Sequence, residues 1–228
     1  MKTKAFLFDM DGLLLDTEWL HICAYMEMTK RLGKPQEAET LKKFIGHSNL
    51  ITCQWLIDEL GCTGTRDELI AEEFKLYCEI LEEKRPEPFR GVRELFAFGD
   101  ARGFHRALVS SSFRHMVDPT MKILADHIER AGHWHEHFHV ICTGDRVERL
   151  KPAPDIYLLA MKELNVAPEE CIAFEDSPAG VTAAHSAGCR VVAIPNMYLK
   201  AGDVPHDRTH FVFDSLHEAF LNIENIIE

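Results

Sequence analysis

The chain has 228 residues, of which 46% are hydrophobic and 27% are charged, and this composition excludes a disordered chain. The length suits one core domain, or a core domain with a smaller inserted domain. The formal net charge of -12 argues against nucleic-acid backbones and anionic membrane surfaces as partners.

The first predicted element is a buried strand over Ala5–Phe8, and two aspartates, Asp9 and Asp11, follow it with Gly12. Residues directly after a strand lie at its carboxyl end, where open α/β sheets bind ligands. Two carboxylates about 4 Å apart repel each other by about 4 kcal/mol at an effective dielectric constant of about 20. A divalent cation would offset this repulsion, and Mg²⁺ suits carboxylate ligands and phosphate substrates. The alternative is a polar turn that only follows the strand.

The next segment, residues 16–86, contains no convincing strand, and its apolar residues repeat at helical spacing. Gly33-Lys34-Pro35 and Gly61-Cys62-Thr63-Gly64 interrupt it as loops between helices. We therefore predict a helical cap domain over 16–86, inserted into an α/β core made of 1–15 and 87–228. An insertion after the first strand follows the carboxyl end of the sheet, so this domain can close on a ligand.

After the helical segment, short apolar runs alternate with helical stretches, which predicts a parallel sheet with helices on both faces. The later predicted strands are Ala107–Val109, Val140–Cys142, Cys171–Phe174, Val191–Ile194 and Phe211–Phe213. Ser177-Pro178 predicts the start of a helix that Gly188 ends, and Ser215 with Glu218 predicts a capping box. The predicted fold class is α/β, with a Rossmann-like parallel sheet.

The seven cysteines are odd in number and show no CxxC spacing. They predict reduced, mostly buried thiols in a cytoplasmic protein. The first apolar run is short and acidic residues follow it, so the sequence indicates neither a signal peptide nor a transmembrane span.

The stretch from His133 to His139 carries four alternating histidines. In a strand, all four side chains would share one face and could bind a transition metal. We interpret the stretch as a solvated histidine-rich surface, and the sequence leaves metal binding there open.

Polar side chains follow the predicted strands in four stretches. These are Asp9-Met10-Asp11-Gly12, Ser110-Ser111-Ser112, Lys151-Pro152 and Glu175-Asp176-Ser177. Because the carboxyl ends of parallel strands lie side by side, we expect these groups to converge. Together they offer a nucleophile, an acid/base, donors for phosphate oxygens and a metal site, which suits phosphoryl transfer.

Each stretch also has a purely structural alternative. The serines could be an N-cap cluster, and Lys151 could be a solvated loop lysine. Glu175-Asp176 could be an acidic helix start that the helix dipole favours. Taken together with the two N-terminal aspartates, however, the stretches favour a functional site, in which Lys151 is the only basic residue.

In this order the four stretches resemble the motifs of the haloacid dehalogenase superfamily of phosphotransferases, over nearly the whole chain. The matching segments are Phe8–Glu18, Ser110, Lys151–Asp155 and Phe174–Gly180. The subgroup with a helical cap after the first strand includes β-phosphoglucomutase and many small-metabolite phosphatases. Dehalogenases of the superfamily lack the second aspartate, so Asp11 favours phosphate chemistry.

The resemblance implies a role for each motif residue. Asp9 would be the nucleophile that forms an aspartyl-phosphate, and Asp11 would protonate the leaving oxygen and then activate water. Ser110, the backbone N–H of Ser111, and Lys151 would bind the phosphate. The implied cofactor is Mg²⁺, held by Asp9, the backbone carbonyl of Asp11, Asp176 and also Glu175.

Within the cap, the resemblance implies substrate contacts from His21, Gly46, His47 and Asn49. β-Phosphoglucomutase has an arginine where this chain has Asn49, and Asn cannot give phosphate a bidentate charged contact. The sequence therefore predicts a Mg²⁺-dependent phosphatase acting on a small phosphorylated metabolite, either a sugar phosphate or a nucleotide-type monophosphate. A β-phosphoglucomutase-like mutase and a non-catalytic phosphometabolite-binding protein are the alternatives, and the oligomeric state is not readable.

Overall fold

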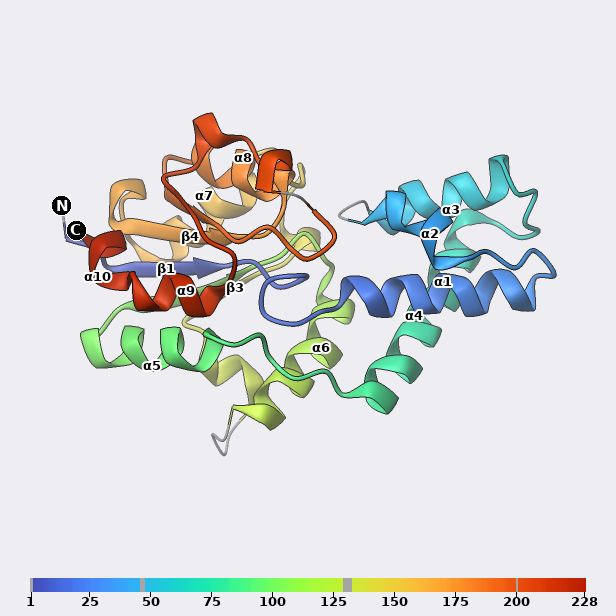
Figure 1. The fold of residues 1–228 in the computed structure, drawn as a ribbon, viewed down its shortest axis with the longest axis horizontal. Coiled ribbons are helices and arrows are strands. Elements are labelled where there is room, and N and C mark those ends of the chain that lie inside the picture. Colours follow the sequence, from blue (N-terminus) through green and yellow to red (C-terminus); the bar gives the residue numbers. More distant parts are fainter. Residues whose placement is uncertain (1, 46–47, 129–132, 200) are drawn as a thin grey trace. The chain divides into compact units, whose positions relative to one another are not determined.

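The computed structural model describes residues 2–45, 48–128, 133–199 and 201–228, and the chain divides into two compact units. One unit is an α/β domain made of Met1–Leu15 and Glu87–Glu228. The other is a helical unit made of Asp16–Pro86, drawn in blue to green in Figure 1.

The α/β unit is built on a six-stranded parallel sheet in the order β3-β2-β1-β4-β5-β6. Its strands are β1 (Ala5–Phe8), β2 (His105–Val109), β3 (Val140–Cys142), β4 (Cys171–Glu175), β5 (Arg190–Ala193) and β6 (Phe211–Val212). The central strand β1 is buried along its whole length, which explains why it reads as a continuous apolar run. The predicted parallel sheet is confirmed, and each predicted strand has a counterpart within two residues of its expected limits.

Helices cover both faces of the sheet (Figure 1). One face packs on α5 (Val92–Arg102), α6 (Arg114–His127), α9 (Leu216–Leu221) and α10 (Ile223–Ile227), and the other on α7 (Asp155–Leu164) and α8 (Pro178–Ser186). Alternate side chains of β1 enter the two cores, Phe6 and Phe8 on the first face and Ala5 and Leu7 on the second. Both cores therefore fix β1, and with it the residues that follow.

The helical unit contains α1 (Glu18–Arg31), α2 (Ala38–Leu41), α3 (Asn49–Asp58) and α4 (Arg66–Lys84). A capping box starts α4, because Thr65 Oγ1 accepts from the backbone of Glu68 while the Glu68 carboxylate accepts from the backbone of Thr65. Buried apolar residues of α1 and α4 pack these two helices together. The described residues of this unit contain no strand, as the helical spacing predicts.

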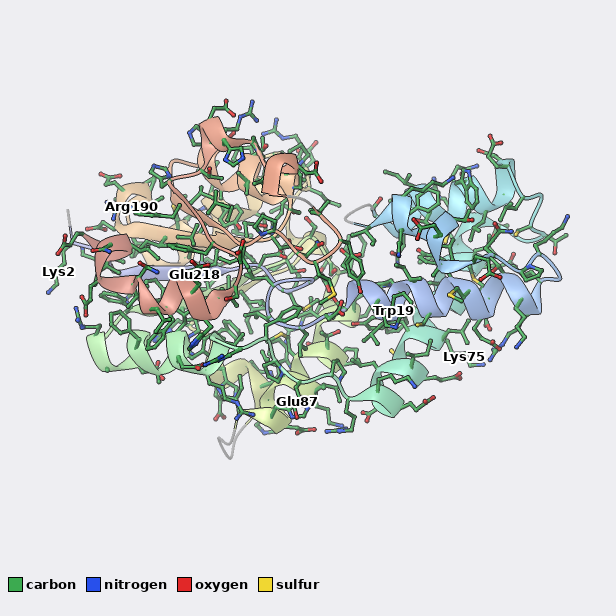
Figure 2. All side chains as sticks on the ribbon, viewed as in Figure 1. Lys2, Trp19, Lys75, Glu87, Arg190 and Glu218 are labelled. Atoms are coloured by element: carbon green, nitrogen blue, oxygen red, sulfur yellow. The ribbon has the colours of Figure 1, made fainter. Side chains whose placement is uncertain are left out.

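Two predicted helix ends can be compared with the structure. Ser177 caps α8 by accepting a hydrogen bond from the helix backbone, and Gly188 follows the end of that helix with a φ of +89°. Ser215 likewise accepts from the backbone of Glu218 at 3.1 Å. The reciprocal half of the capping box is wrong, because the Glu218 carboxylate (labelled in Figure 2) accepts from the backbone of Asp214 at 3.0 Å.

The histidine-rich stretch is not a strand. Trp134–His137 forms a 3-10 helix, so the four histidine side chains do not share one face. His133 and His135 are exposed and stack on each other, with ring centroids 5.4 Å apart. His137 is buried, so the interpretation of a fully solvated surface is wrong for this residue. The helical turn directs His137 and the adjacent Trp134 inward, and an alternating pattern cannot reveal that.

All seven cysteines are free thiols and five of them are buried, as predicted. Among the described residues, no helix combines the length and the apolar character needed to cross a membrane.

Two histidines tie neighbouring strands together through their ring nitrogens. His139 Nδ1 accepts from the backbone N–H of Arg106 at 3.0 Å, and His210 Nδ1 accepts from that of Val191 at 3.1 Å. Desolvation of the ring lowers the pKa of both histidines, and nearby positive charges, those of Arg106 and Arg190 among them, lower it further. The neutral rings therefore stabilise the fold above pH 6.5, and this contribution is lost as the pH falls through the lowered pKa values.

We expect the melting temperature of the wild-type protein to fall between pH 7 and pH 5, partly through these two rings. His139→Asn combined with His210→Asn keeps an acceptor but removes the titration, so its melting temperature should depend less on pH. His135→Asn, at an exposed ring in the 3-10 helix outside the sheet, is the matched control. Equal pH slopes for the wild-type protein and the double variant would contradict this assignment.

Candidate active site

The candidate site begins where β1 ends. The register pairs Phe8 with Phe174 of β4 and with Leu108 of β2, so Asp9 lies level with the ends of both neighbouring strands. Its backbone N–H donates to the carbonyl of Phe174 at 3.1 Å, and its side chain is only 10% exposed. The strand order reverses direction at β1, which is the position where open α/β sheets place their ligands.

Lys151 reaches Asp9 from the segment between β3 and α7. Its ammonium donates to Asp9 Oδ1 at 2.5 Å, to Glu175 Oε1 at 2.6 Å and to the carbonyl oxygen of Val109 at 2.9 Å. These three acceptors match the three N–H groups of an ammonium. Burial opposes the charge, but Asp9 and Glu175 outweigh it and raise the pKa of Lys151. The alternative of a solvated loop lysine is wrong, since the side chain is 5% exposed.

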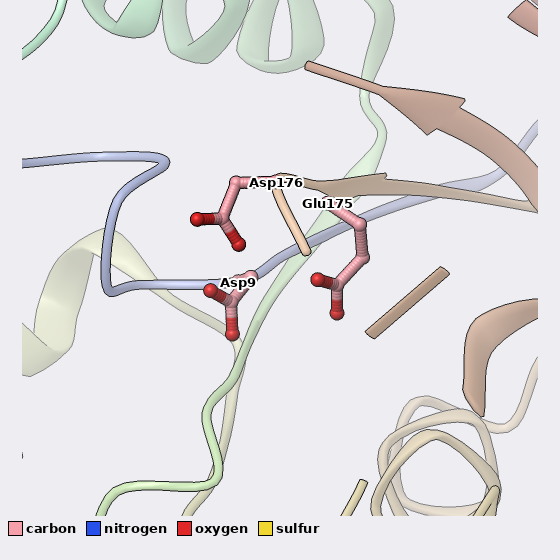
Figure 3. A group of neighbouring side chains, drawn as sticks. All are labelled: Asp9, Glu175 and Asp176. Atoms are coloured by element: carbon pink, nitrogen blue, oxygen red, sulfur yellow. The ribbon is translucent and has the colours of Figure 1, made fainter. Parts of the chain in front are cut away.

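Three buried carboxylates meet beside this lysine. Asp9, Glu175 and Asp176 each offer an oxygen, and these oxygens lie within 4.8 Å of one another (Figure 3). Burial raises the pKa of the Asp9 carboxyl to about 8, because desolvation outweighs the charge of Lys151 and the charges of Glu175 and Asp11 add to the rise. These hard oxygen ligands could hold a divalent cation.

The second and third carboxylates have different surroundings. Asp176 Oδ2 accepts from the side-chain amide of Asn196 at 2.8 Å. Glu175 Oε1 accepts from Tyr157 as well as Lys151, whereas its Oε2 is buried with no hydrogen-bond partner among the described residues. An unsatisfied buried carboxylate oxygen is costly, and a cation would satisfy it.

The serines after β2 face the second aspartate. Asp11 Oδ2 accepts from Ser112 Oγ at 2.7 Å and lies 3.4 Å from Ser110 Oγ, which in turn accepts from the backbone N–H of Ser112 at 3.0 Å. Ser111 Oγ is buried with no hydrogen-bond partner among the residues described. The N-cap alternative is wrong, because α6 begins at Arg114 and no serine side chain caps it.

Two glycines leave room for the acidic side chains. A Cβ at Gly12, where φ is +74°, would lie 2.2 Å from Asp176 Oδ2. A Cβ at Gly180, in the first turn of α8, would lie 1.8 Å from Glu175 Oε2. Neither contact is physically possible, so these glycines are required by the packing of the carboxylates.

We expect Gly180→Ala to lower the free energy of unfolding by about 1–3 kcal/mol, because a buried carboxylate must move to admit the methyl group. Gly99→Ala is the matched control, since Gly99 also lies in a helix and its nearest neighbour would be an ordinary 3.6 Å away. Denaturant unfolding of both variants checks this. Equal stability of the two variants would show that Glu175 yields without cost.

The helical unit contains a separate polar cluster. Glu73 of α4 is fully buried, and its two oxygens bond to His21 Nδ1 at 2.7 Å and to the Asn49 amide nitrogen at 2.8 Å. The His21 ring also stacks on Tyr77, with ring centroids 4.4 Å apart. The structure thus brings together two of the predicted substrate contacts, while Gly46 and His47 lie outside the described residues.

The sequence places Ser112 in a polar stretch of the site without giving it a role, and it does not identify three further residues of these clusters, Asn196, Tyr157 and Glu73. Ser112 carried a readable signal, since it lies two residues after Ser110 in the same polar stretch. Asn196 follows β5, whose carboxyl end belongs to the same edge of the sheet. Tyr157 and Glu73 lie in helices, where an apolar neighbourhood and helical spacing concealed them.

Known proteins resemble this chain along most of its length. Protein CbbY of Rhodobacter capsulatus is 35% identical over 89% of this chain and 90% of its own. A phosphorylated carbohydrates phosphatase of Thermotoga maritima is 33% identical over 81% of this chain and 82% of its own. The crystal structure of a variant of CbbY from Rhodobacter sphaeroides, in complex with xylulose-(1,5)bisphosphate, superposes with a TM-score of 0.81 at 26% identity, covering 96% of both chains.

The family comparison covers the same region as the motifs. The profile of the family described as haloacid dehalogenase-like hydrolase matches residues 6–194, which include both aspartates after β1, the serines after β2, Lys151 and the acidic pair at the end of β4. The chain therefore belongs to the haloacid dehalogenase-like hydrolase family.

Proposed function

We propose that this enzyme is a Mg²⁺-dependent phosphatase that hydrolyses a small phosphorylated metabolite through an aspartyl-phosphate on Asp9. One observation carries the proposal: a buried lysine bonds to Asp9 within a cluster of three carboxylates at the sheet edge. A carboxylate in this position is held by the lysine and largely buried, so it is oriented to attack phosphorus. The relatives named as phosphatases support the same reaction class.

In this proposal Asp9 attacks phosphorus, the bond to the leaving oxygen breaks, and Asp11 gives that oxygen its proton. Asp11 then takes a proton from the water that hydrolyses the aspartyl-phosphate, which returns Asp9 to its carboxylate form. Ser112 supports this role, since its hydroxyl bonds to Asp11 and orients the carboxyl group. Ser110 and the backbone N–H of Ser111 would hold phosphate oxygens.

The donor set fits a magnesium ion. Asp9 and Asp176 would hold it with the backbone carbonyl of Asp11, and the unpartnered Oε2 of Glu175 supports that residue as a further ligand, direct or through water. The ion would stabilise negative charge on the phosphoryl group and weaken the repulsion among the carboxylates. All three N–H groups of Lys151 already have acceptors. A bound phosphate oxygen would therefore share one of these N–H groups with Asp9.

Magnesium dependence is the first test. We expect hydrolysis of 4-nitrophenyl phosphate to stop in EDTA and to return when Mg²⁺ is added in excess. Glu175→Gln should raise the Mg²⁺ concentration needed for half-maximal rate, and a matched substitution of the exposed Glu169 should not. Full activity in EDTA would contradict a metal-dependent reaction. Binding of phosphate without any turnover would instead favour the non-catalytic alternative.

We propose hydrolysis rather than isomerisation, and a substrate that is a sugar phosphate or a nucleotide-type monophosphate. A mutase must bind a second phosphate group of the substrate while the phosphoryl group on the enzyme is returned to the product. We propose that the helical unit is the cap and that His21 and Asn49 contact the substrate. The Asn49 amide nitrogen donates one N–H to Glu73, which leaves a second N–H and a neutral carbonyl oxygen. Neither group gives a phosphate the charged, bidentate contact of an arginine.

Incubation with β-glucose 1-phosphate, Mg²⁺ and a trace of the bisphosphate separates the two reactions. We expect inorganic phosphate to appear faster than glucose 6-phosphate, because the loss of one charged contact worth about 1.5–3 kcal/mol loosens the bisphosphate. Asn49→Arg should shift the balance toward glucose 6-phosphate. Rapid formation of glucose 6-phosphate by the wild-type enzyme would favour the mutase instead.

A further inference from the structure

Tyr157 reaches the candidate active site through Glu175. It lies in α7, is fully buried, and donates a hydrogen bond from its hydroxyl to Glu175 Oε1. The same oxygen accepts from Lys151 Nζ at 2.6 Å, and that ammonium lies 5.3 Å from the centre of the Tyr157 ring. A neutral donor and a charged donor therefore meet at one carboxylate oxygen.

Few other contacts orient the Glu175 carboxylate. Its Oε2 is buried, has no hydrogen-bond partner among the described residues, and lies beside the space that Gly180 leaves. Burying an ionised carboxylate is costly unless it is hydrogen-bonded, and the bonds to Oε1 supply that compensation. The orientation of Glu175 thus depends on Lys151 and Tyr157.

Lys151 in turn is shared between two carboxylates. Its distances to Asp9 Oδ1 and Glu175 Oε1 are 2.5 and 2.6 Å, so neither acid holds it alone. A neutral hydroxyl at Glu175 satisfies part of that carboxylate without adding charge. If this hydroxyl were removed, Glu175 would turn and draw the ammonium away from Asp9.

We propose that Tyr157 is a positioning residue, whose hydroxyl fixes Glu175 and thereby keeps Lys151 Nζ on Asp9. Tyr157 bonds to Glu175, itself a proposed metal ligand, and acts on Asp9 only through Lys151. Its kinetic consequence rests on the proposed function, since Lys151 and Asp9 affect turnover only if this site transfers phosphoryl groups. Its geometric consequence does not depend on any activity.

Crystal structures of the wild-type protein and Tyr157→Phe test the geometric part. The substitution removes one hydroxyl and leaves the ring, so we expect the variant to fold. The Glu175 carboxylate should turn, and the distance from Lys151 Nζ to Asp9 Oδ1 should lengthen beyond hydrogen-bond range. Met161→Leu, a buried change one turn along the same helix, controls for altered packing and should leave both side chains in place. Unmoved Glu175 and Lys151 side chains in Tyr157→Phe would overturn the proposal.

A double-mutant cycle tests the kinetic part with 4-nitrophenyl phosphate and Mg²⁺. Tyr157→Phe should lower kcat by about 10- to 100-fold, the range of one charge-assisted hydrogen bond, with KM changed less than about 3-fold. In a Glu175→Gln background the same substitution should cost less than about 3-fold, because the charge through which Tyr157 acts is gone. An equal loss in both backgrounds, or an unchanged kcat, would overturn the proposal. If the wild-type protein releases no phosphate, the proposed function fails, and the two crystal structures still decide whether Tyr157 positions Glu175.

Discussion

Asp9→Asn is expected to abolish the hydrolysis of 4-nitrophenyl phosphate while leaving a folded protein. A neutral amide cannot attack phosphorus, and it also removes one of the two carboxylates that hold Lys151. Lys151 would keep its bond to Glu175, so the ammonium is not stranded without a counter-charge. Initial-rate measurements and circular dichroism spectra of the purified variant check both parts of this prediction.

Asp11→Asn is the comparison that separates the two aspartates. The amide still has an oxygen that can accept from Ser112, so the local geometry survives, but the proton needed for the leaving oxygen is lost. We expect turnover to fall by about 10²–10⁴-fold rather than to disappear. Equal residual rates in the two variants would mean that the aspartates do not have the separate roles assigned to them.

The second large effect is expected for Lys151→Ala. Removing a buried ammonium leaves Asp9 and Glu175 facing each other without a counter-charge, which should cost about 3–5 kcal/mol in the free energy of unfolding. Turnover and the binding of phosphate mimics should fall together, because the same charge serves both. Denaturant unfolding, steady-state kinetics and the inhibition constant of orthovanadate measure the three quantities.

Added Mg²⁺ distinguishes the two consequences of Lys151→Ala. A cation between the carboxylates should restore part of the lost stability, since it replaces part of the missing positive charge. It should not restore turnover to the wild-type level. Lys162→Ala, at an exposed lysine of α7, is the matched control and should change neither quantity. Wild-type kinetics in Lys151→Ala would return this residue to a structural role.

The centre of the sheet could be predicted from the sequence because β1 and β4 are buried on both faces. Each one appears as an apolar run, and the residues at the ends of the runs give the sheet edge that carries the site. The positions of Asp9, Lys151 and the acidic pair at the end of β4 therefore predict that these residues lie together. The distances between these residues depend on the register of β1 with β2 and β4, which no local sequence pattern specifies.

Other features depend on contacts between distant parts of the chain. Tyr157 lies among apolar residues of a helix, and only the fold brings its hydroxyl to Glu175. Glu73 lies at a helical position that charge patterning assigns to the surface, yet two partners from other helices bury it. The alternation of histidines from 133 to 139 would place them on a shared face only in a strand, and the structure has a 3-10 helix there.

Trapping the phosphoenzyme tests the central claim most directly. The wild-type enzyme, Asp9→Asn and Asp11→Asn would each be mixed with Mg²⁺ and ³²P-labelled 4-nitrophenyl phosphate, quenched in acid, and treated with hydroxylamine, which cleaves acyl phosphates. We predict hydroxylamine-sensitive label on the wild-type protein, in a peptide containing Asp9, and none on Asp9→Asn. Hydroxylamine-sensitive label on Asp9→Asn at the wild-type level would contradict the assignment of Asp9 as the nucleophile.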